Sequence, residues 1–244
     1  MLFGKKYEMS EQYIDEINIA LADSSNLSLK PKPASTVLLI RDSQDSIEVF
    51  MIKRAAATNF GNAWVFPGGK VDVEDIHHSK ENSYLLAAIR ECFEESGVLI
   101  AQNNSGIIYS PEDEGDLDLL KKYQKKINDR KLNFHNFLDE LNLKPAFNKL
   151  NFFSHWVTPK TEKKRYSTKF FLAQFPKNQL ALHDGYEGVE SAWIAPKEAL
   201  RLYSEGKFPI ILPTIKSLEE LKNFNCSTDL MKKNFKNEFL GNSN

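Results

Sequence analysis

The order of the elements predicts an α+β fold, in which helices pack against a mixed β-sheet. Strand-like segments come first, an amphipathic helix follows, strands resume, and helices close the chain, without the regular strand–helix alternation of a parallel sheet. No stretch between residues 34 and 215 resembles a linker, and the sequence holds no internal repeat. We therefore expect one domain over residues 1–244, interrupted by a charged, helix-favouring insertion at about 111–149.

The first seventy residues predict a helix, a hairpin and a short strand. Apolar residues at helical spacing predict a helix over 8–22, and the breaker KPKPAS precedes an apolar strand at 35–40. The polar turn RDSQDS then leads to a second strand at 47–54, which completes a hairpin. A short strand in GNAWVFPGGK, residues 61–70, stops at a proline and two glycines, and a polar loop follows it to residue 82.

The remaining elements follow from the same signals. A helix is expected over 83–96 with Gly97 as its C-terminal cap, and VLIAQ begins a further strand. The insertion should form two helices, the second at about 133–141. Strand patterns resume in three segments, at 150–159, 165–175 and 189–196. Pro196 begins a helix that Gly206 ends, and a final helix covers about 215–224.

Composition excludes several classes of protein. The chain is 41% hydrophobic and 27% charged, and its formal net charge of −1 gives no global attraction for nucleic acid or an anionic membrane. Cys92 and Cys226 make neither a disulfide framework nor a zinc spacing. Without a signal-like apolar segment at the N-terminus, a spanning apolar run or a peroxisomal signal in EFLGNSN, we expect a cytoplasmic protein.

The stretch AAIRECFEESGVLI, residues 87–100, places three carboxylates within five positions. On a helix, Glu91, Glu94 and Glu95 fall within an arc of about 100°, opposite the apolar side chains. Glu91 and Glu95 form a like-charge i,i+4 pair, which destabilises a helix unless it is compensated. Arg90 cannot neutralise all three, whereas Mg²⁺ prefers oxygen ligands. From the helix alone, a solvated acidic face and a metal site remain alternatives.

The loop before this helix adds a second signal. FPGGK ends a strand with two glycines, which permit tight backbone conformations and the close approach of a ligand. Loop and helix together resemble the signature of the Nudix hydrolases, Gly-x5-Glu-x7-Arg-Glu-U-x-Glu-Glu-x-Gly-U, in which U is aliphatic. The residues at the corresponding places are Gly69, Asp75, Arg90, Glu91, Glu94, Glu95 and Gly97.

This sequence departs from the signature in two main ways and in one minor way. Asp75 replaces the first glutamate, and fourteen residues, Ile76 to Ile89, separate it from Arg90, where the short pattern has seven. Cys92 also stands where an aliphatic residue is usual. The resemblance implies a Nudix fold, which is an αβα sandwich around a mixed sheet, and hydrolysis of a pyrophosphate bond with Mg²⁺ or Mn²⁺.

The resemblance also implies roles for individual residues. Glu94 and Glu95 match the main metal ligands, Glu91 the ligand or general base beside them, and the Gly68 carbonyl a backbone ligand. Arg90 matches the arginine of the signature and completes the candidate catalytic residues. Its expected role is structural: it should pair with the acidic loop or with a neighbouring glutamate. Glu187 or Glu190 is a candidate further ligand, because the family often supplies one near this strand; the alternative for each is an exposed carboxylate at a strand end.

Two outer segments resemble one branch of the family, the peroxisomal coenzyme A and acyl-CoA diphosphatases. FFSHWVTPKTEKKRYSTKFFLAQFP and DGYEGVESAWIAPKEAL share the Trp-x-Thr-Pro element, the Arg-aromatic-x-Thr-x-Phe-Phe strand and the Glu-x-x-x-x-Trp-x-x-Pro element of that branch. Its motif upstream of the box is present only in part, as Arg54 and Ala55. Arg54, Arg165 and Lys169 are therefore candidates for binding the phosphates of the substrate.

The expected substrate is coenzyme A or an acyl-CoA, cleaved to adenosine 3′,5′-bisphosphate and a (acyl-)phosphopantetheine. Two alternatives stay open: an ADP-ribose or nucleotide-sugar pyrophosphatase, and a Nudix-fold protein that binds a nucleotide without cleaving it. The expected partner is thus a small-molecule diphosphate, with neither nucleic acid nor membrane. RNA decapping is disfavoured because the sequence lacks a basic stripe.

Overall fold

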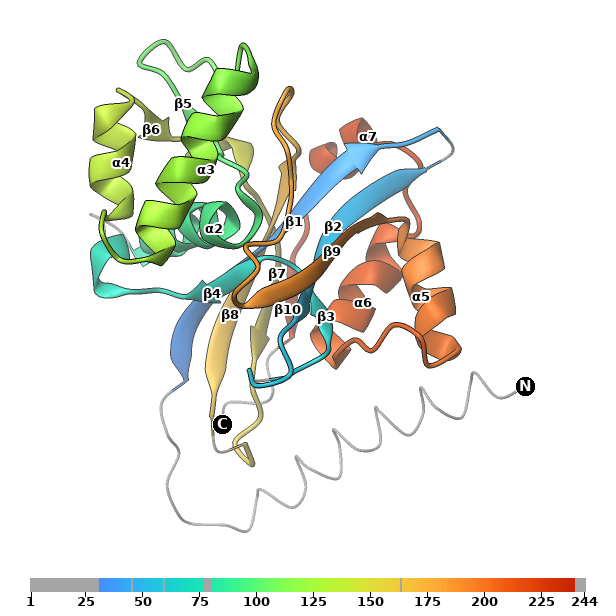
Figure 1. The fold of residues 1–244 in the computed structure, drawn as a ribbon. Helices are drawn as coiled ribbons and strands as arrows, with labels where there is room; N and C mark the ends of the chain where they lie inside the picture. The colour runs from blue at the N-terminus through green and yellow to red at the C-terminus, as the bar shows by residue number, and fades with distance from the viewer. Residues whose placement is uncertain (1–30, 45, 59, 77–79, 163, 240–244) are drawn as a thin grey trace.

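A computed structural model describes residues 31–44, 46–58, 60–76, 80–162 and 164–239 (Figure 1). The helix predicted over 8–22 lies outside the described residues. In the described part of the chain, no helix is both long enough and apolar enough to cross a membrane. The expectation that residues 1–244 form a single domain stays a prediction.

A mixed sheet forms the middle of the molecule. Its main path runs β10-β7-β8-β1-β2-β3, while β4 pairs with β1 and β9 pairs with β2. The pairs β1–β8 and β7–β10 are parallel, and the other pairs are antiparallel, which confirms the mixed sheet. The strands are β1 (Lys32–Asp42), β2 (Ile47–Arg54), β3 (Trp64–Val65), β4 (Gly68–Lys70), β7 (Asn151–Val157), β8 (Tyr166–Gln174), β9 (Gly188–Ile194) and β10 (Asn237–Phe239).

Side chains that alternate along the central strand β1 serve two separate cores. Val37 and Leu39 belong to the core beneath one layer of helices, while Leu38 and Ile40 belong to the core beneath the other. All four are fully buried, as expected for a strand covered on both faces. This arrangement confirms the predicted αβα sandwich.

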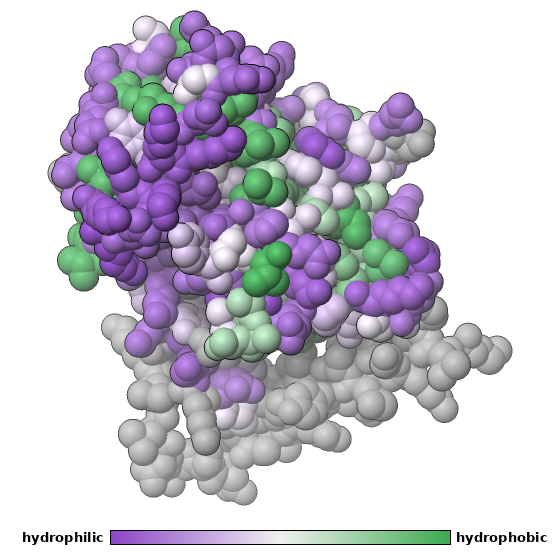
Figure 2. Space-filling model, viewed as in Figure 1, coloured by the Kyte–Doolittle hydropathy of each residue, from purple (hydrophilic) through white to green (hydrophobic). Residues whose placement is uncertain are grey.

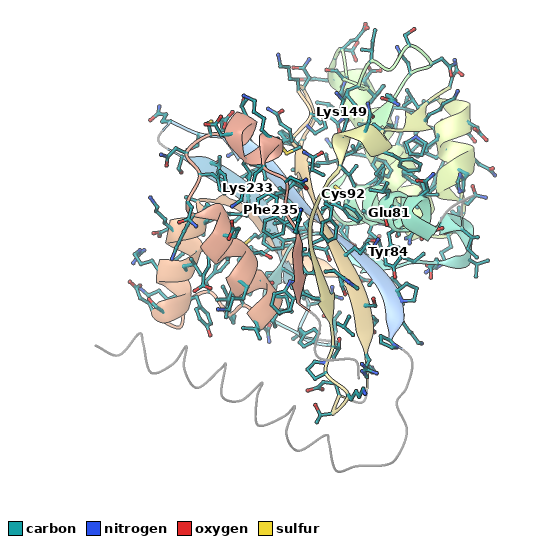
Figure 3. The ribbon with its side chains drawn as sticks, turned by 180° about the vertical axis from the view of Figure 1, so that it is seen from behind. Glu81, Tyr84, Cys92, Lys149, Lys233 and Phe235 are labelled. Carbon is teal, nitrogen blue, oxygen red and sulfur yellow. The ribbon has the colours of Figure 1, made fainter. Side chains whose placement is uncertain are left out.

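The helices fall into two layers, which Figure 1 shows on opposite sides of the sheet. The first holds α2 (Lys80–Ser96), α3 (Glu114–Asn128) and α4 (Phe134–Glu140); the second holds α5 (Pro196–Ser204), α6 (Leu212–Leu221) and α7 (Ser227–Lys232). Figure 3, seen from behind, labels Glu81, Tyr84 and Cys92 along α2. The short elements are η1 (Val73–Asp75), β5 (Ala101–Gln102), β6 (Lys144–Pro145) and η2 (Phe147–Lys149).

Several boundaries differ from the sequence expectation. Strand β1 begins at Lys32, inside the predicted breaker, because Pro33 lies near the strand's start and its carbonyl accepts from Val71 N at 3.0 Å. Helix α2 begins at Lys80, three residues before the predicted start. It ends as predicted at Gly97, whose φ is +72° and whose N–H donates to the Phe93 carbonyl at 2.9 Å. The strand predicted at VLIAQ is reduced to the two residues of β5.

The insertion forms the two predicted helices and packs on α2. Asp113 and Asn133 cap α3 and α4, each accepting a backbone N–H with its side chain. Phe134 and Phe137 of α4 are buried against Phe93 of α2, with ring centroids 6.1 and 4.8 Å away. The two helices are therefore part of the core as well as an insertion, although their outer surface is mainly hydrophilic (Figure 2).

Candidate active site

The acidic side of α2 is largely covered. The Glu91, Glu94 and Glu95 side chains are 14%, 25% and 10% exposed. Side chains on the opposite side of the helix are buried as predicted, including Ile89, Cys92 and Phe93. A freely solvated acidic face, the simpler of the two alternatives, is therefore excluded.

Arg90 and Asp75 form a buried pair beneath the acidic side. Arg90 Nε and Nη2 donate to the two Asp75 carboxylate oxygens at 2.9 and 2.7 Å, and both side chains are at most 3% exposed. Arg90 Nη2 also donates to the Lys70 carbonyl at 3.0 Å, and Asp75 accepts from Asp72 N at 2.8 Å. The bidentate contact fixes the loop after β4 against α2. Despite the longer spacing, Asp75 thus serves a structural role.

Arg90 also contacts two of the glutamates. Its Nη1 donates to Glu91 Oε1 at 3.0 Å and to Glu94 Oε1 at 3.2 Å. Burial alone would lower the pKa of Arg90, but the hydrogen bond to Asp75 and the surrounding negative charges outweigh burial and raise the pKa. Arg90 therefore stays charged, and it positions carboxylates from within the protein.

Glu95 is held by a different set of partners. It accepts from Gly68 N at 2.8 Å, and Arg54 Nη1 lies 3.9 Å from its other oxygen. Arg54 Nη2 pairs with Glu187 at 3.2 Å. The structure thus brings Arg54 and Glu187 to Glu95, whereas Glu190 is 58% exposed and pairs with Lys53 instead.

Burial changes the protonation of all three glutamates. It raises the pKa of Glu91 to about 7, with the neighbouring charge of Glu94 adding to the effect and Arg90 opposing it. Burial likewise raises the pKa of Glu94, and that of Glu95 well above its usual range, where the charge of Glu91 contributes further. The protein thus buries more negative charge here than its own cations neutralise.

Two glycines allow β4 to approach these carboxylates. A Cβ atom on Gly69 would lie 2.4 Å from the Glu91 carboxyl group, and one on Gly68 would lie 2.4 Å from the Ser35 carbonyl of β1. Any larger residue would push β4 away from α2 or from β1. The glycines of FPGGK are therefore required by close packing around the glutamates.

The glutamates open into a cavity of about 390 Å³. Helix α2 forms one wall, the turn after α3 forms another, and the loop before β9 contributes a third. The lining residues are Glu74, Glu91, Glu94, Glu95, Ile127, Asn128, Asp129, Arg130, Leu132, Asn133, Asp184, Tyr186 and Glu187. Sequence reasoning missed the turn residues and Tyr186, because no local pattern shows which side of the insertion faces α2.

The donor set suits a hard divalent cation, since carboxylate oxygens are the ligands that Mg²⁺ prefers. In the described part of the chain, however, no three His, Cys, Asp or Glu side chains are arranged around one ion. Arg90 holds Glu91 and Glu94, while Gly68 N holds Glu95. Each contact with Arg90 uses only Oε1 of Glu91 or Glu94, so an ion can bind through the second oxygen of each carboxylate while Arg90 keeps its partners.

Two candidate phosphate-binding residues lie away from the cavity. Lys169 pairs with Glu81, thirteen residues from Glu94 along α2, or about 20 Å of helix. Arg165 Nε donates to the Thr158 carbonyl at 3.0 Å in the β7–β8 hairpin, whose tip points away from the insertion (Figure 1). Neither cation therefore reaches the glutamates: Lys169 lies in β8, and Arg165 lies in the turn before it.

Comparison with known proteins agrees with this geometry. Residues 78–221, more than half of the chain, match the family model described as the NUDT19 Nudix domain. The acyl-coenzyme A diphosphatase NUDT19 of Xenopus laevis is 24% identical over 238 residues, with 76% of this chain and 62% of that protein covered. A putative nudix hydrolase 7 of Caenorhabditis elegans is 30% identical over 174 residues, with 71% and 55% covered. The chain thus spans less than two thirds of the length of either relative.

Among solved structures, a Nudix hydrolase from Alicyclobacillus acidocaldarius superposes with a TM-score of 0.75 at 22% identity. The match covers 86% of this chain and 99% of the other. The structural likeness confirms the fold, and the family match adds the sequence signal. The chain belongs to the Nudix hydrolases, in the family of the NUDT19 Nudix domain.

Proposed function

We propose that this protein hydrolyses the pyrophosphate bond of coenzyme A or an acyl-CoA in a reaction that depends on Mg²⁺ or Mn²⁺. The products are adenosine 3′,5′-bisphosphate and a (acyl-)phosphopantetheine. The observation that carries the proposal is the group of three largely covered glutamates, which open into a cavity large enough for a diphosphate and outnumber the cations that contact them.

The proposed roles follow from the contacts. Glu94 and Glu95 provide oxygen ligands, with the Gly68 carbonyl beside them, and Glu187 is better placed than Glu190 to add another. Glu91 lines the same cavity, where it is placed to accept the proton of the attacking water or to act as a further ligand. Arg90 and Arg54 orient these carboxylates. A bound divalent cation would neutralise the diphosphate and activate the water.

The substrate assignment rests on similarity. One relative is named an acyl-coenzyme A diphosphatase, and the segments around Trp156 and Arg165 resemble the same branch. Arg165 itself lies away from the cavity. The segment around it therefore supports similarity to the coenzyme A diphosphatases, but it does not support a contact between Arg165 and a phosphate. A small-molecule diphosphate as partner and a cytoplasmic location, both expected from the sequence, belong to this proposal.

The second candidate activity is ADP-ribose or nucleotide-sugar hydrolysis, which stays open because the upstream motif of the coenzyme A branch lacks its further arginine beyond Arg54 and Ala55. The third candidate is a nucleotide-binding protein without activity. It is disfavoured by the complete set Arg90, Glu91, Glu94 and Glu95, because binding alone does not require so much buried negative charge.

A substrate panel tests the proposal. Coenzyme A, acetyl-CoA, ADP-ribose and a nucleotide sugar are incubated with Mg²⁺ or Mn²⁺, and the products are identified by mass spectrometry. We expect the coenzyme A compounds to give the highest kcat/KM, and Glu94→Gln to reduce turnover of every substrate by at least ~10²-fold. If ADP-ribose is the best substrate and coenzyme A is inert, the substrate assignment fails. Tight nucleotide binding without turnover would instead support the binding protein.

A further inference from the structure

The wall of the cavity that comes from the insertion carries a cation. Among the described residues that line the cavity, seven are acidic, and Arg130 is the one basic side chain. The acidic residues are Glu74, Glu91, Glu94, Glu95, Asp129, Asp184 and Glu187. An anionic ligand entering this cavity meets repulsion on every wall except at Arg130.

The backbone presents Arg130 in an unusual way. Helix α3 ends in a turn in which Arg130 N donates to the Ile127 carbonyl and Lys131 N donates to the Lys126 carbonyl, both at 2.8 Å. This is the Schellman arrangement, whose left-handed residue is usually glycine. Arg130 occupies that position with φ of +56°. A residue with a long side chain therefore occupies a position at which the left-handed backbone favours glycine.

The turn is also fixed relative to the glutamates. Gln124 Nε2 and Asn128 Nδ2, on the last turns of α3, donate to the Glu94 carbonyl at 2.9 and 3.1 Å. The charge of Arg130 acts on Glu94, where it opposes the rise in pKa that burial causes. In the part of the chain that the structure describes, the Arg130 guanidinium forms no hydrogen bond or ion pair with another residue. It remains available to a ligand.

We propose that Arg130 is a substrate-binding residue, which contacts the scissile diphosphate from the insertion side while the glutamates of α2 act on the other side. The inference rests on the proposed function and deepens it, since it gives the insertion a part in substrate binding. A guanidinium offers parallel N–H donors that match two phosphate oxygens, and it stays charged at any working pH. Arg130 therefore takes the place that the sequence suggested for Arg165.

The turn offers a test in which removal of the side chain should not unfold the protein. Arg130→Gly removes the guanidinium and places the preferred residue in the left-handed position. Asn142→Gly is the matched control: Asn142 has φ of +53° in the corresponding turn after α4, where Leu143 N donates to the Leu138 carbonyl at 2.9 Å, and it does not line the cavity. Arg130→Lys keeps the charge but not the fork.

Two measurements are made on the full chain with Mg²⁺. The first is kcat/KM for coenzyme A, dephospho-coenzyme A and ADP-ribose. The second is calorimetric binding of α,β-methylene-ADP, in which a methylene group replaces the bridging oxygen of the diphosphate, so that the compound is not hydrolysed. Arg130→Gly should lower kcat/KM by about 10- to 100-fold for all three substrates alike. It should weaken α,β-methylene-ADP comparably and melt no lower than wild type. Arg130→Lys should recover part of the loss, and Asn142→Gly should match wild type.

The outcomes separate this inference from the proposed function. Wild-type kinetics and binding in Arg130→Gly overturn it, and so does a loss seen with coenzyme A but not with dephospho-coenzyme A, since the contact would then be to the 3′-phosphate. If the wild-type protein hydrolyses none of the substrates, the proposed function fails. The titration with α,β-methylene-ADP still tests whether Arg130 contacts a diphosphate. Weaker binding in Arg130→Gly then supports the contact, and equal or absent binding overturns it.

Discussion

Helix α2 carries two buried charged groups that differ in how their charges are balanced. On one side, Arg90 and Asp75 match each other atom for atom, with two short hydrogen bonds and almost no exposure. In the second group, Glu91 and Glu94 share Arg90 Nη1, while Glu95 accepts from Gly68 N and has only a distant contact with Arg54. The first group is satisfied within the protein, whereas the second is left with excess negative charge.

The difference in charge balance distinguishes the pair that stabilises the fold from the glutamates that are candidates for the active site. A buried ion pair with all its hydrogen bonds made holds a loop in place, and nothing further needs to bind it. Buried carboxylates without sufficient counter-charge raise their own pKa and provide a site for a cation. Neighbouring residues of a single sequence motif therefore have different roles. Asp75 and Arg90 hold the loop after β4 against α2. The three glutamates face the cavity.

The largest effect is expected where the balanced pair is broken. Asp75→Ala leaves Arg90 buried without its main partner, so the free energy of unfolding at pH 7 should fall by about 3–5 kcal/mol, measured by urea denaturation. Glu48→Ala is the control, because its partner Arg41 is 42% exposed and such pairs contribute about 0–1 kcal/mol. If Asp75→Ala and Glu48→Ala lowered the free energy of unfolding equally, the buried Arg90–Asp75 pair would contribute no more than the exposed Arg41–Glu48 pair.

A smaller effect should appear as a pH dependence of the metal-free protein. Because the folded pKa of Glu91 is about 7, above the unfolded value near 4.5, the folded state binds more protons between these values. The stabilising contribution is therefore full below about pH 4.5 and is lost as the pH rises through about 7. Thermal unfolding in the presence of a chelator should follow this trend, and Glu91→Gln should make it less steep, with Glu94 and Glu95 causing the remainder. The same slope in both proteins would show that other groups cause the trend.

The smallest effect is expected at the hairpin cation. Arg165 bonds to the Thr158 carbonyl away from the cavity, so Arg165→Ala should change kcat/KM by no more than about twofold, as for an ordinary surface substitution. Steady-state kinetics with coenzyme A and dephospho-coenzyme A measure this directly. A loss as large as that expected for Arg130→Gly would return the phosphate contact to Arg165.

Much of the fold was predictable because the signals are local. The apolar run from Val37 to Ile40, the cap at Gly97 and the helical pattern on both sides of Arg130 depend on neighbours in the sequence, and the structure confirms the elements that they predict. The start of β1 was mispredicted, because pairing with β8 and with the loop after β4 outweighs the breaking tendency of Pro33.

The candidate site was predictable only in part. The three glutamates lie on one helix, so their spacing alone brings them together. The partners of Glu95 come from β2 and β4, and Arg130 and Tyr186 come from segments whose approach to α2 depends on tertiary packing. The sequence likewise places Lys169 on a strand, but it does not show that Lys169 meets Glu81.

The most direct test of the account is whether the unbalanced glutamates bind a divalent cation. Calorimetric titration of Mg²⁺ and of Mn²⁺ compares wild type with Glu94→Gln, Glu95→Gln and the control Glu190→Gln, whose side chain is exposed and outside the cavity. We expect saturable binding that weakens at least ~10-fold in the first two variants and is unchanged in the third, as when a metal ligand is lost. Unchanged binding in both Glu94→Gln and Glu95→Gln would contradict the account.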